Sequence, residues 1–325
     1  MTDQPDDLQD LLDGAGLTED ENLPEDHRSG FVAVIGRPNV GKSTLMNAIL
    51  GEKIAIVSPK PQTTRLRQLG ILTRDDAQLI FVDTPGIHRP RTPLGEFMVS
   101  VAVDALKDAD VVLFVVDASE RPTPEDEQIA ELVRKAEGVT PVLMVLNKID
   151  LVASPEQLDA HVALFRVMVP FADWVTTVAK EGKGADEVLA RMIAALPRGP
   201  RYFPADQLSD TAIRDIVAEM IREKVLLNLE QEVPHGVATE VNEFTERNER
   251  LTYVGATIYV ERDSHKGIVI GKQGQMLKII SQQAREEIEQ FLGTKVYLEL
   301  WVKVLKNWRR DDKALRRLGY RIARD

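Results

Sequence analysis

The fold of this chain is decided by Gly36-Arg37-Pro38-Asn39-Val40-Gly41-Lys42-Ser43. An apolar run at residues 31–35 precedes this stretch and a helical pattern at residues 44–50 follows it, so strand, loop and helix succeed one another. The spacing G-x-x-x-x-G-K-S is that of the phosphate-binding P-loop, in which backbone N–H groups turn inward around phosphate oxygens. We expect Lys42 to reach the β- and γ-phosphates and the Ser43 hydroxyl to ligate Mg²⁺.

Strand patterns and helical patterns alternate from this loop as far as residue 197. Several strand candidates are continuous β-branched runs, as expected for strands that are buried on both faces of a sheet. The alternation predicts an α/β fold: a P-loop domain with a parallel-type sheet and crossover helices. The strand candidates are residues 31–35, 68–72, 78–82, 111–116, 142–146 and 174–178, and the helix candidates are residues 44–50, 94–105, 124–135, 155–168 and 185–196.

A second, smaller α+β domain is expected after residues 197–205, which hold three prolines and a glycine and predict a linker. Its helix candidates are residues 209–229, 265–270, 275–291 and 312–318, and its strand candidates are residues 236–245, 253–261 and 295–304. The expected domains are an acidic disordered leader at 1–28, the P-loop domain at 29–197, a linker at 198–208 and the second domain at 209–325.

Composition excludes several classes of protein. The chain holds no cysteine, which rules out disulfides, thiolate metal sites and a cysteine nucleophile, and which fits a cytoplasmic protein. No apolar run approaches the roughly 20 residues that span a bilayer. The acidic first residues carry no apolar segment of the kind found in signal peptides.

The net charge of −11 is unevenly distributed. Residues 1–30 hold ten acidic residues and one arginine, whereas residues 265–325 hold 14 basic and seven acidic residues. A basic C-terminal region suggests a polyanionic partner, although a solvated helix face would show the same charge.

Two motifs after the P-loop distinguish GTP from ATP. One strand pattern ends in Asp83-Thr84-Pro85-Gly86, a D-x-x-G motif that places Asp83 to hold the Mg²⁺ shell through water and the Gly86 N–H to meet the γ-phosphate. Another ends in Asn147-Lys148-Ile149-Asp150, an N-K-x-D motif. The Asp150 carboxylate can accept both N1–H and the 2-amino group of guanine, a donor pair that adenine lacks. All three motifs are expected at carboxyl ends of strands, where open α/β sheets bind ligands.

Two less specific segments complete the expected nucleotide site. Between the P-loop and D-x-x-G lies Gln62-Thr63-Thr64-Arg65, where a threonine would complete the Mg²⁺ shell when GTP binds; we prefer Thr64, with Thr63 second and a simple ST-turn as the alternative. The last strand ends in Val178-Ala179-Lys180, where GTPases usually show Ser-Ala-Lys. The Ala179 N–H would meet guanine O6, but the valine lacks a hydroxyl that braces the loop.

Catalysis needs a positioned water and charge compensation. Ras-like enzymes place a glutamine just after D-x-x-G, where this chain has Ile87, which cannot orient water. We therefore expect slow intrinsic hydrolysis or another catalytic aid. Asn39 is a candidate for that aid, because asparagine at this position resembles GTPases that bind K⁺ against the phosphates in place of an arginine finger. A plain turn residue is an equal alternative.

The expected nucleotide site can be stated residue by residue. The metal ligands are Ser43, Asp83 and Thr64 or Thr63, and the groups that assist catalysis are Lys42, Thr64, Gly86 and Asn39. Asn147 and Lys148 would brace the P-loop and the base. The residues expected to contact nucleotide are Gly36, Arg37, Pro38, Asn39, Val40, Gly41, Lys42, Ser43, Thr44, Asp83, Thr84, Pro85, Gly86, Ile87, Asn147, Lys148, Asp150, Val178, Ala179 and Lys180.

In the second domain, a short apolar turn is joined to a long helix by Gly271-Lys272-Gln273-Gly274, the GxxG form of a KH loop. The paired glycines allow a nucleic-acid backbone to approach closely, and Lys272 supplies charge to it. Two strands before the loop and one after it are the arrangement of a type II KH domain. The expected RNA contacts, including the apolar residues that would line the groove, are Ile268, Val269, Ile270, Gly271, Lys272, Gln273, Gly274 and Lys278.

Two tryptophans of the C-terminal region receive different interpretations. Trp301 lies in the alternating segment 297–304, whose pattern is mainly that of sheet packing, so we expect Trp301 in the core or in an interface. Trp308 stands beside Arg309 and Arg310 and predicts a more exposed basic-aromatic cluster that could contact RNA.

These motifs together resemble the Era family of bacterial ribosome-associated GTPases over roughly residues 28–322. The resemblance implies GTP or GDP with Mg²⁺, assembly of the small (30S) ribosomal subunit as a monomer, binding to the 3′ end of 16S rRNA, and in some preparations peripheral association with the inner face of the cell membrane. Val178 and the long acidic leader depart from the family pattern. Further motifs that carry it are Ser58-Pro59-Lys60-Pro61-Gln62-Thr63-Thr64-Arg65, Phe203-Pro204-Ala205-Asp206, Ile221-Arg222-Glu223-Lys224 and Tyr297-Leu298-Glu299-Leu300-Trp301-Val302-Lys303-Val304.

Three functions stay open on the sequence alone. The first is a switch enzyme in which GTP and Mg²⁺ order residues 62–65 and 86–91, the second domain repacks, and RNA affinity depends on the nucleotide. The second is a tRNA-modification or signalling GTPase whose C-terminal domain binds protein, a reading that the GxxG loop disfavours. The third is an RNA-binding protein that binds GTP but barely turns it over, which Ile87 allows.

Overall fold

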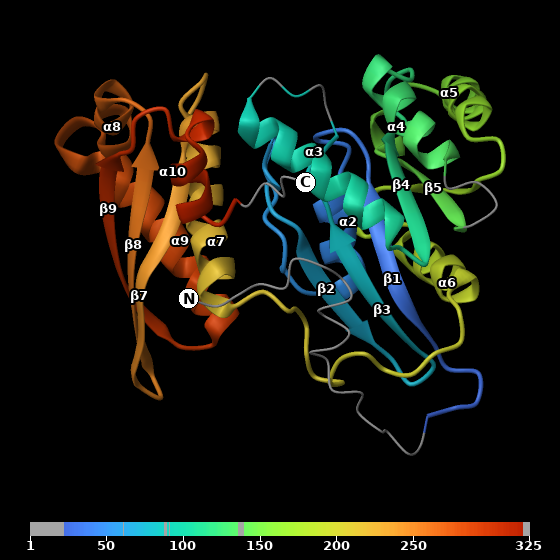
Figure 1. Cartoon of the computed structure of the whole chain (residues 1–325), viewed down its shortest axis with the longest axis horizontal. Coiled ribbons are helices and arrows are strands. Elements are labelled where there is room, and N and C mark those ends of the chain that lie inside the picture. The colour runs from blue at the N-terminus through green and yellow to red at the C-terminus, as the bar shows by residue number, and fades with distance from the viewer. Residues whose placement is uncertain (1–22, 61, 88–89, 91, 136–139, 321–325) are drawn as a thin grey trace. The chain divides into compact units, whose positions relative to one another are not determined.

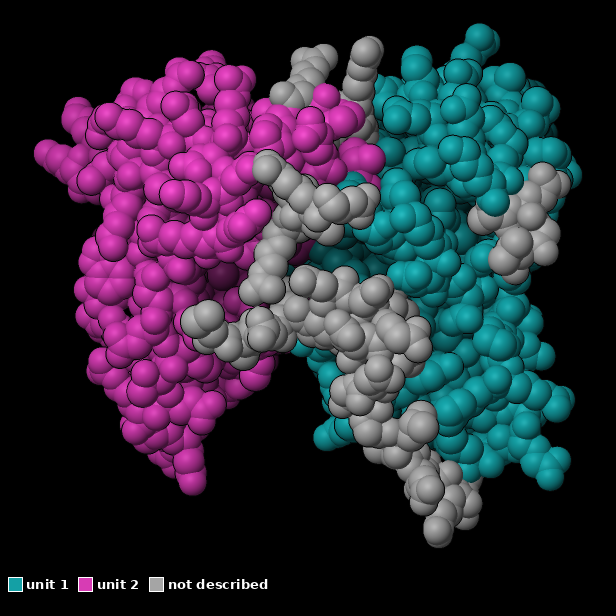
Figure 2. Space-filling model, in the orientation of Figure 1, with its two compact units in different colours: residues 1–54, 67–88, 100–210 teal, residues 55–66, 89–99, 211–325 magenta. Residues whose placement is uncertain are grey.

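Two compact units make up the computed structural model of this 325-residue chain, which describes residues 23–60, 62–87, 90, 92–135 and 140–320 (Figure 1). The first unit comprises residues 1–54, 67–88 and 100–210, and the second comprises residues 55–66, 89–99 and 211–325 (Figure 2). The leader expected at residues 1–28 falls largely outside the described residues.

The first unit is built on a six-stranded sheet with the order β2-β3-β1-β4-β5-β6. Strand β2 pairs antiparallel with β3 at one edge, and every other pairing is parallel, which confirms the predicted α/β fold. Strands β1, β3, β4 and β5 are almost entirely buried, as their apolar sequences require. Their bounds are β1 (Arg28–Ile35), β2 (Gln68–Thr73), β3 (Ala77–Asp83), β4 (Val111–Asp117), β5 (Val142–Asn147) and β6 (Asp173–Thr177).

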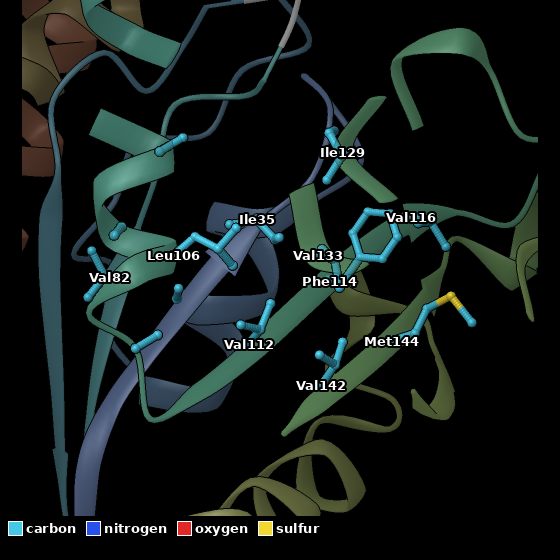
Figure 3. Close-up of a cluster of buried hydrophobic side chains, with 14 of the residues drawn as sticks. Ile35, Val82, Leu106, Val112, Phe114, Val116, Ile129, Val133, Val142 and Met144 are labelled. Carbon is cyan, nitrogen blue, oxygen red and sulfur yellow. The ribbon is translucent and has the colours of Figure 1, made fainter. Parts of the chain in front are cut away.

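Helices connect these strands and cover the sheet. Figure 3 shows part of the resulting core, where Leu106 from α3 and Ile129 and Val133 from α4 belong to one buried cluster with the strand residues Phe114 and Met144. The helical segments are α2 (Lys42–Leu50), α3 (Pro93–Lys107), α4 (Pro124–Arg134), α5 (Pro155–Met168) and α6 (Ala185–Ala195), with single 3₁₀ turns at η1 (Ile149–Leu151) and η2 (Ala179–Glu181).

Residues 198–208, the expected linker, are bound to the first unit by hydrogen bonds and packing. The Gln78 side chain donates to the Phe203 carbonyl (2.8 Å) and accepts the N–H groups of Tyr202 (2.7 Å) and Phe203 (3.0 Å). The Phe203 ring joins the sheet core, and Ile71 N–H donates to the Leu208 carbonyl at 2.8 Å. These contacts make the predicted linker an ordered part of the first unit.

The second unit contains a three-stranded sheet, β7-β8-β9, in which β7 and β8 are antiparallel and β8 and β9 are parallel. Helices α7 and α9 pack their apolar sides against it, with Ile221 and Ile288 meeting Val254 and Ile258 in one core. This confirms the KH-type order. The elements are α7 (Ile213–Asn228), η3 (Pro234–Gly236), β7 (Ala238–Asn248), β8 (Leu251–Val260), α8 (Asp263–Ile270), η4 (Lys272–Gly274), α9 (Gln275–Leu292), β9 (Lys295–Val304), η5 (Trp308–Arg310) and α10 (Asp312–Arg317).

Two segments from the N-terminal half of the sequence cluster with the second unit. They are residues 55–66 and residues 89–99, so helix α3 begins in the second unit and ends in the first. Within the part of the chain that the structure describes, no helix combines the length and the apolar character needed to cross a bilayer.

Candidate nucleotide and RNA sites

The nucleotide motifs stand at the carboxyl ends of parallel strands of the first unit. The P-loop follows β1, Asp83 is the last residue of β3, and Asn147 is the last residue of β5. Since β1 pairs with both β3 and β4, and β4 pairs with β5, these ends share one edge of the sheet. The topology therefore brings together the three motifs that the sequence assigned to one site.

The P-loop is in contact with the D-x-x-G motif. A Cβ atom added to Gly86 would lie 2.6 Å from the backbone nitrogen of Pro38, so only glycine permits this approach. Ile87 N–H donates to the Gly36 carbonyl at 3.3 Å. Gly41, at φ +103, immediately precedes helix α2 and leaves the helix N-terminus open toward the loop.

Lys42 is buried beneath the P-loop. Its Nζ donates to the carbonyls of Gly36 (3.2 Å) and Arg37 (3.1 Å). Burial lowers the pKa of Lys42 from 10.5 to about 8, with Arg37 adding to this effect and Asp83 opposing it. An ammonium group that is poorly compensated in this way would gain strongly from phosphate oxygens.

Ser43 and Asp83, two of the predicted metal ligands, meet directly. The Ser43 hydroxyl donates to Asp83 Oδ2 at 2.7 Å, and Asp83 is fully buried. A hydroxyl and a carboxylate at a loop that binds phosphate are the oxygen donors that Mg²⁺ prefers, so the residues present fit this ion. Neighbouring Thr84 donates its hydroxyl to the Val34 carbonyl at 2.8 Å, which fixes the D-x-x-G loop to β1.

Asn147 braces the base side of the site. Its Nδ2 donates to the Val40 carbonyl of the P-loop (2.8 Å), and its Oδ1 accepts the Thr177 hydroxyl (3.0 Å) and the Ala179 N–H (2.9 Å). The bracing hydroxyl that Val178 lacks thus comes from Thr177, which the sequence reading missed. The sequence signal that could have indicated Thr177 is a polar residue at the end of a strand.

Lys148 is held by Asp117, a second residue that the sequence reading missed. Lys148 Nζ donates to Asp117 Oδ2 at 2.6 Å, and the Ser119 hydroxyl donates to Asp117 Oδ1 at 2.5 Å. Burial pushes the pKa of Asp117 upward, but the hydrogen bonds from Lys148 and Ser119 outweigh it and hold the pKa below its ordinary value. Asp117 ends β4, at the same sheet edge as the motifs.

Arg37 of the P-loop is tied to acidic groups around α4. Its Nε donates to Asp126 Oδ2 at 3.2 Å, it pairs with Glu120, and it lies 3.9 Å from Asp117. Asp126 also closes a capping box with Thr123 at the start of α4. Arg37 therefore holds the P-loop against this helix in addition to its expected place at the nucleotide.

Asp150 presents a carboxylate that is ready for the base. The side chain is exposed, and among the described residues its oxygens make no hydrogen bond or ion pair. Lys148 takes a left-handed backbone conformation (φ +64) before the 3₁₀ turn that carries Asp150. Both carboxylate oxygens are thus available to accept the N1–H and 2-amino hydrogens of guanine.

Ile87 and Asn39 differ sharply in exposure. Ile87 is 1% exposed and belongs to the sheet core, so its side chain can neither contact nucleotide nor orient water. Only its backbone faces the P-loop. Asn39 is exposed and has φ +65, a conformation that asparagine tolerates in turns. This geometry is compatible with both interpretations of Asn39.

The GxxG loop joins α8 to α9 in the second unit. Gly271 has φ +71, and a Cβ there would lie 2.6 Å from that of Met276. Gly274 has φ +78 and open space within 4 Å of its missing Cβ. Lys272 and Lys278 are exposed, and Ile268 is 49% exposed. A positively charged loop with an accessible backbone is what a nucleic-acid chain requires.

Two expectations for the second unit are corrected, and a third is narrowed. Val269 is fully buried in the core and cannot line a groove. Trp308, expected in an exposed cluster, is fully buried and donates its indole N–H to the Gly236 carbonyl at 2.9 Å. Trp301 is 41% exposed, because it shares a strand face with Tyr297 and Lys303 rather than with Val302. Of its two expected places, the core is thereby excluded, and an interface stays a prediction.

Comparisons with known proteins find family matches in both parts of the chain. Residues 31–148 match the family described as 50S ribosome-binding GTPase, and residues 232–309 match the KH domain family. GTPase Era of Ruminiclostridium cellulolyticum is 50% identical over 295 residues, which are 91% of this chain and 98% of the relative. GTPase Era of Caldicellulosiruptor saccharolyticus is 51% identical over 297 residues, with coverage of 91% and 98%.

Two solved structures resemble this chain over most of its length. One is Era in complex with MgGDPNP and nucleotides 1506–1542 of 16S ribosomal RNA, with 40% identity and a TM-score of 0.87. The other is a variant of Aquifex aeolicus Era bound to GDP.AlF4-, with 40% identity and a TM-score of 0.86. Each match covers 91% of this chain and 100% of the other.

Proposed function

Because the chain belongs to the Era family of GTPases, we propose that it is a GTP-hydrolysing switch that binds the 3′ end of 16S rRNA and acts in biogenesis of the small (30S) ribosomal subunit. The observation that carries the proposal is the combination of a guanine-specific P-loop site and a KH loop on one chain. A relative of 40% identity holds MgGDPNP together with 16S nucleotides 1506–1542, and 16S rRNA belongs to the small subunit.

The residues of the first unit divide the work of hydrolysis among them. Ser43 and Asp83, whose side chains meet at 2.7 Å, would hold Mg²⁺, and the ion would supply positive charge against the phosphates. Lys42 binds the β- and γ-phosphates and loses its contacts to the P-loop carbonyls when it does so. The Gly86 N–H meets the γ-phosphate, and Asn147 keeps P-loop and base loop in register.

The RNA part of the proposal is tested with Lys272→Asp. Binding of the GTP-analogue form to a single strand that copies the 3′ end of 16S rRNA should weaken by about 10- to 100-fold, because a phosphate contact is replaced by repulsion. Lys306→Asp is the matched control, since Lys306 is an exposed lysine of the same unit outside the loop. Equal weakening by both variants would mean general electrostatics instead of a KH site. Binding by Lys272→Asp as strong as that of the unaltered protein would place the RNA contact outside the GxxG loop. No binding by either protein would transfer the second unit to another RNA or to a protein partner, as in a tRNA-modification or signalling GTPase.

Potassium tests the role of Asn39. We expect phosphate release to fall by at least about tenfold when K⁺ is replaced by Na⁺, because a cation among the phosphates supplies what an arginine finger supplies elsewhere. Asn39→Ala should show the low rate in both salts. Equal rates of the unaltered protein in K⁺ and Na⁺ would assign Asn39 to the turn, and a negligible rate in both would favour an RNA-binding protein that only holds GTP.

The proposal also includes the family's cellular setting. We expect a cytoplasmic monomer whose partner is the 30S subunit, with peripheral association at the inner face of the cell membrane. Light scattering checks the monomer, and sedimentation with 30S subunits against sedimentation with lipid vesicles separates the two kinds of partner.

A further inference from the structure

Asp117 stands between the phosphate side and the base side of the expected nucleotide site. It is the last residue of β4, which lies between β1 and β5 in the sheet. The P-loop follows β1, and the N-K-x-D loop begins at Asn147, the residue paired with Asp117 in the register of β4 and β5. Asp117 is buried, and all of these elements belong to the first unit.

The two carboxylate oxygens of Asp117 have different partners. Oδ1 accepts the backbone N–H (3.0 Å) and the hydroxyl (2.5 Å) of Ser119, and these bonds fix the orientation of the carboxylate. Oδ2 accepts Lys148 Nζ at 2.6 Å. A hydrogen bond between two ionised groups is about twice as strong as one between neutral groups, so Lys148 is the partner that Asp117 holds most firmly.

Lys148 depends on Asp117 for its position. Within the described part of the chain, its side chain makes no hydrogen bond or ion pair with any other residue. A lysine without a partner samples many rotamers, so a single buried acceptor decides where its ammonium group lies. The backbone of Lys148 is left-handed (φ +64), a conformation that a non-glycine residue keeps only where neighbouring contacts support it. The bond to Asp117 is such a contact.

Arg37 is the other cation near Asp117, but its position does not depend on that carboxylate. Its Nη2 is 3.9 Å from Asp117 Oδ2, which is beyond hydrogen-bond distance. Its Nε donates to Asp126 at 3.2 Å, and Glu120 forms a further ion pair with it. Because two other acidic residues hold Arg37 more closely, removal of the Asp117 charge should act mainly on Lys148.

The place of Lys148 in its loop gives this contact a function. Lys148 lies between Asn147, which braces the P-loop, and the 3₁₀ turn that carries Asp150, the expected guanine ligand. We propose that Asp117 is a positioning residue for guanine nucleotides, which holds the N-K-x-D loop in place through Lys148 and thereby slows the release of a bound nucleotide. The inference rests on the proposed function, in which this loop reads the base. Because GDP and GTP carry the same base, Asp117 affects both alike.

Asp117→Asn tests the positioning role. The amide keeps the size of the carboxylate, but only one of its two terminal atoms can accept a hydrogen bond, so Lys148 and Ser119 cannot both be held. GDP and a GTP analogue should both dissociate about 10- to 100-fold faster, because a hydrogen bond between charged groups is lost. Hydrolysis of bound GTP in a single turnover should change by less than about twofold, since contacts common to the ground and transition states do not alter its rate. Unchanged dissociation of both nucleotides, with or without slower hydrolysis, would overturn the proposal.

Glu120→Gln is the matched control. Glu120 belongs to the same charged cluster, because it pairs with Arg37, but it makes no contact with Lys148. Its side chain is half-exposed, so the pair contributes little, and GDP dissociation should change by less than about twofold. A change as large as that in Asp117→Asn would show that the charge near the site, rather than the position of Lys148, controls dissociation, and the proposal would fail.

Lys148→Met shows whether Asp117 acts through Lys148. Methionine keeps much of the aliphatic chain and removes the ammonium group, so it breaks the same contact from the other side. GDP should dissociate about 10- to 100-fold faster from this variant. From the double variant with Asp117→Asn it should dissociate no more than about twofold faster than from Lys148→Met alone. Effects that multiply in the double variant would contradict action through Lys148.

Ser119→Ala keeps the proposal testable if Asp117→Asn fails to fold. It removes the hydroxyl that orients the carboxylate, while the charge of Asp117 remains. GDP should dissociate about two- to fivefold faster, because the carboxylate is less firmly held for Lys148. Equal dissociation from Ser119→Ala and from the unaltered protein would then decide against the positioning role.

Titration of the unaltered protein with GDP and with ADP separates failure of this inference from failure of the proposed function. Equal affinities for the two nucleotides would refute the proposed guanine site, and the positioning role with it. A clear preference for GDP, together with unchanged dissociation from Asp117→Asn, would refute the positioning role alone.

Discussion

Replacing Asp150 with asparagine is expected to weaken GDP binding by about 10²- to 10⁴-fold, because two charge-assisted hydrogen bonds to guanine are lost, each of about 1.5–3 kcal/mol. The asparagine amide would face the N1–H and 2-amino groups of guanine with one acceptor and two surplus donors. Xanthine carries a carbonyl oxygen where guanine carries the amino group. The variant should therefore bind XDP more tightly than GDP, as titration of both nucleotides would show.

A loss of GDP affinity in Asp150→Asn can be attributed to the carboxylate itself, because few neighbouring groups depend on it. Its exposed carboxylate makes no hydrogen bond or ion pair with the described residues, so the substitution should leave the melting temperature of the nucleotide-free protein nearly unchanged. Asp150→Asn with normal GDP affinity would show that another group reads the base. Loss of both GDP and XDP binding with a normal melting temperature would mean that the loop, rather than the carboxylate, was altered.

Lys42→Met should lower kcat/KM for GTP by at least about 10³-fold, because it removes the cation that faces the β- and γ-phosphates. The same change should stabilise the nucleotide-free protein. Methionine fills a similar volume without a charge, whereas the buried ammonium is destabilised by desolvation, as its pKa of about 8 shows. The substitution also removes the hydrogen bonds of Lys42 to the Gly36 and Arg37 carbonyls, which offsets part of this gain. We therefore expect a net increase of about 1–3 kcal/mol in the free energy of unfolding at pH 7.

The pH dependence of stability identifies Lys42 as the cause. In the folded protein its pKa is about 8, below the ordinary value of 10.5, so the unfolded chain binds the extra proton between these two pH values. Stability of the nucleotide-free protein attributable to Lys42 therefore rises as the pH increases from 8 to 10.5 and is lowest below pH 8. Denaturant unfolding at pH 7 and pH 10 should show the advantage of Lys42→Met shrinking at the higher pH. A constant difference would contradict a buried, charged lysine.

The fold followed from the sequence where the signal was local. The apolar runs at residues 31–35, 111–116 and 142–146 became β1, β4 and β5, because a strand buried on both faces needs a continuous apolar sequence. The strand at residues 68–72 was predicted, but its antiparallel direction was not, since alternation of apolar residues carries no information on strand direction. That the motifs lie together was predicted from the general rule that open α/β sheets bind ligands at the carboxyl ends of their strands.

The sequence predicted the motif residues of the candidate site but not the residues that support them. The motif residues are those proposed to contact phosphates and base directly, and each motif is a short pattern that its spacing along the chain reveals. The residues that support them lie far away in sequence: Thr177 meets Asn147 and Asp117 meets Lys148, each across 30 or 31 positions. A hydroxyl or carboxylate at a strand end is common, and its partner becomes known only when neighbouring strands are aligned.

By itself the sequence determined the guanine nucleotide site, the KH loop and the order of elements, because each depends on a short spacing of residues along the chain. Tertiary structure alone decided which aromatic residues and which charged residues are buried. Trp308 and Arg65 are separated by over two hundred positions, yet they share one site with the carbonyls of residues 235–237. Periodicity shows that an element has two faces, but only packing shows what covers each face. For the same reason, only the folded structure shows that residues 55–66 cluster with the second unit.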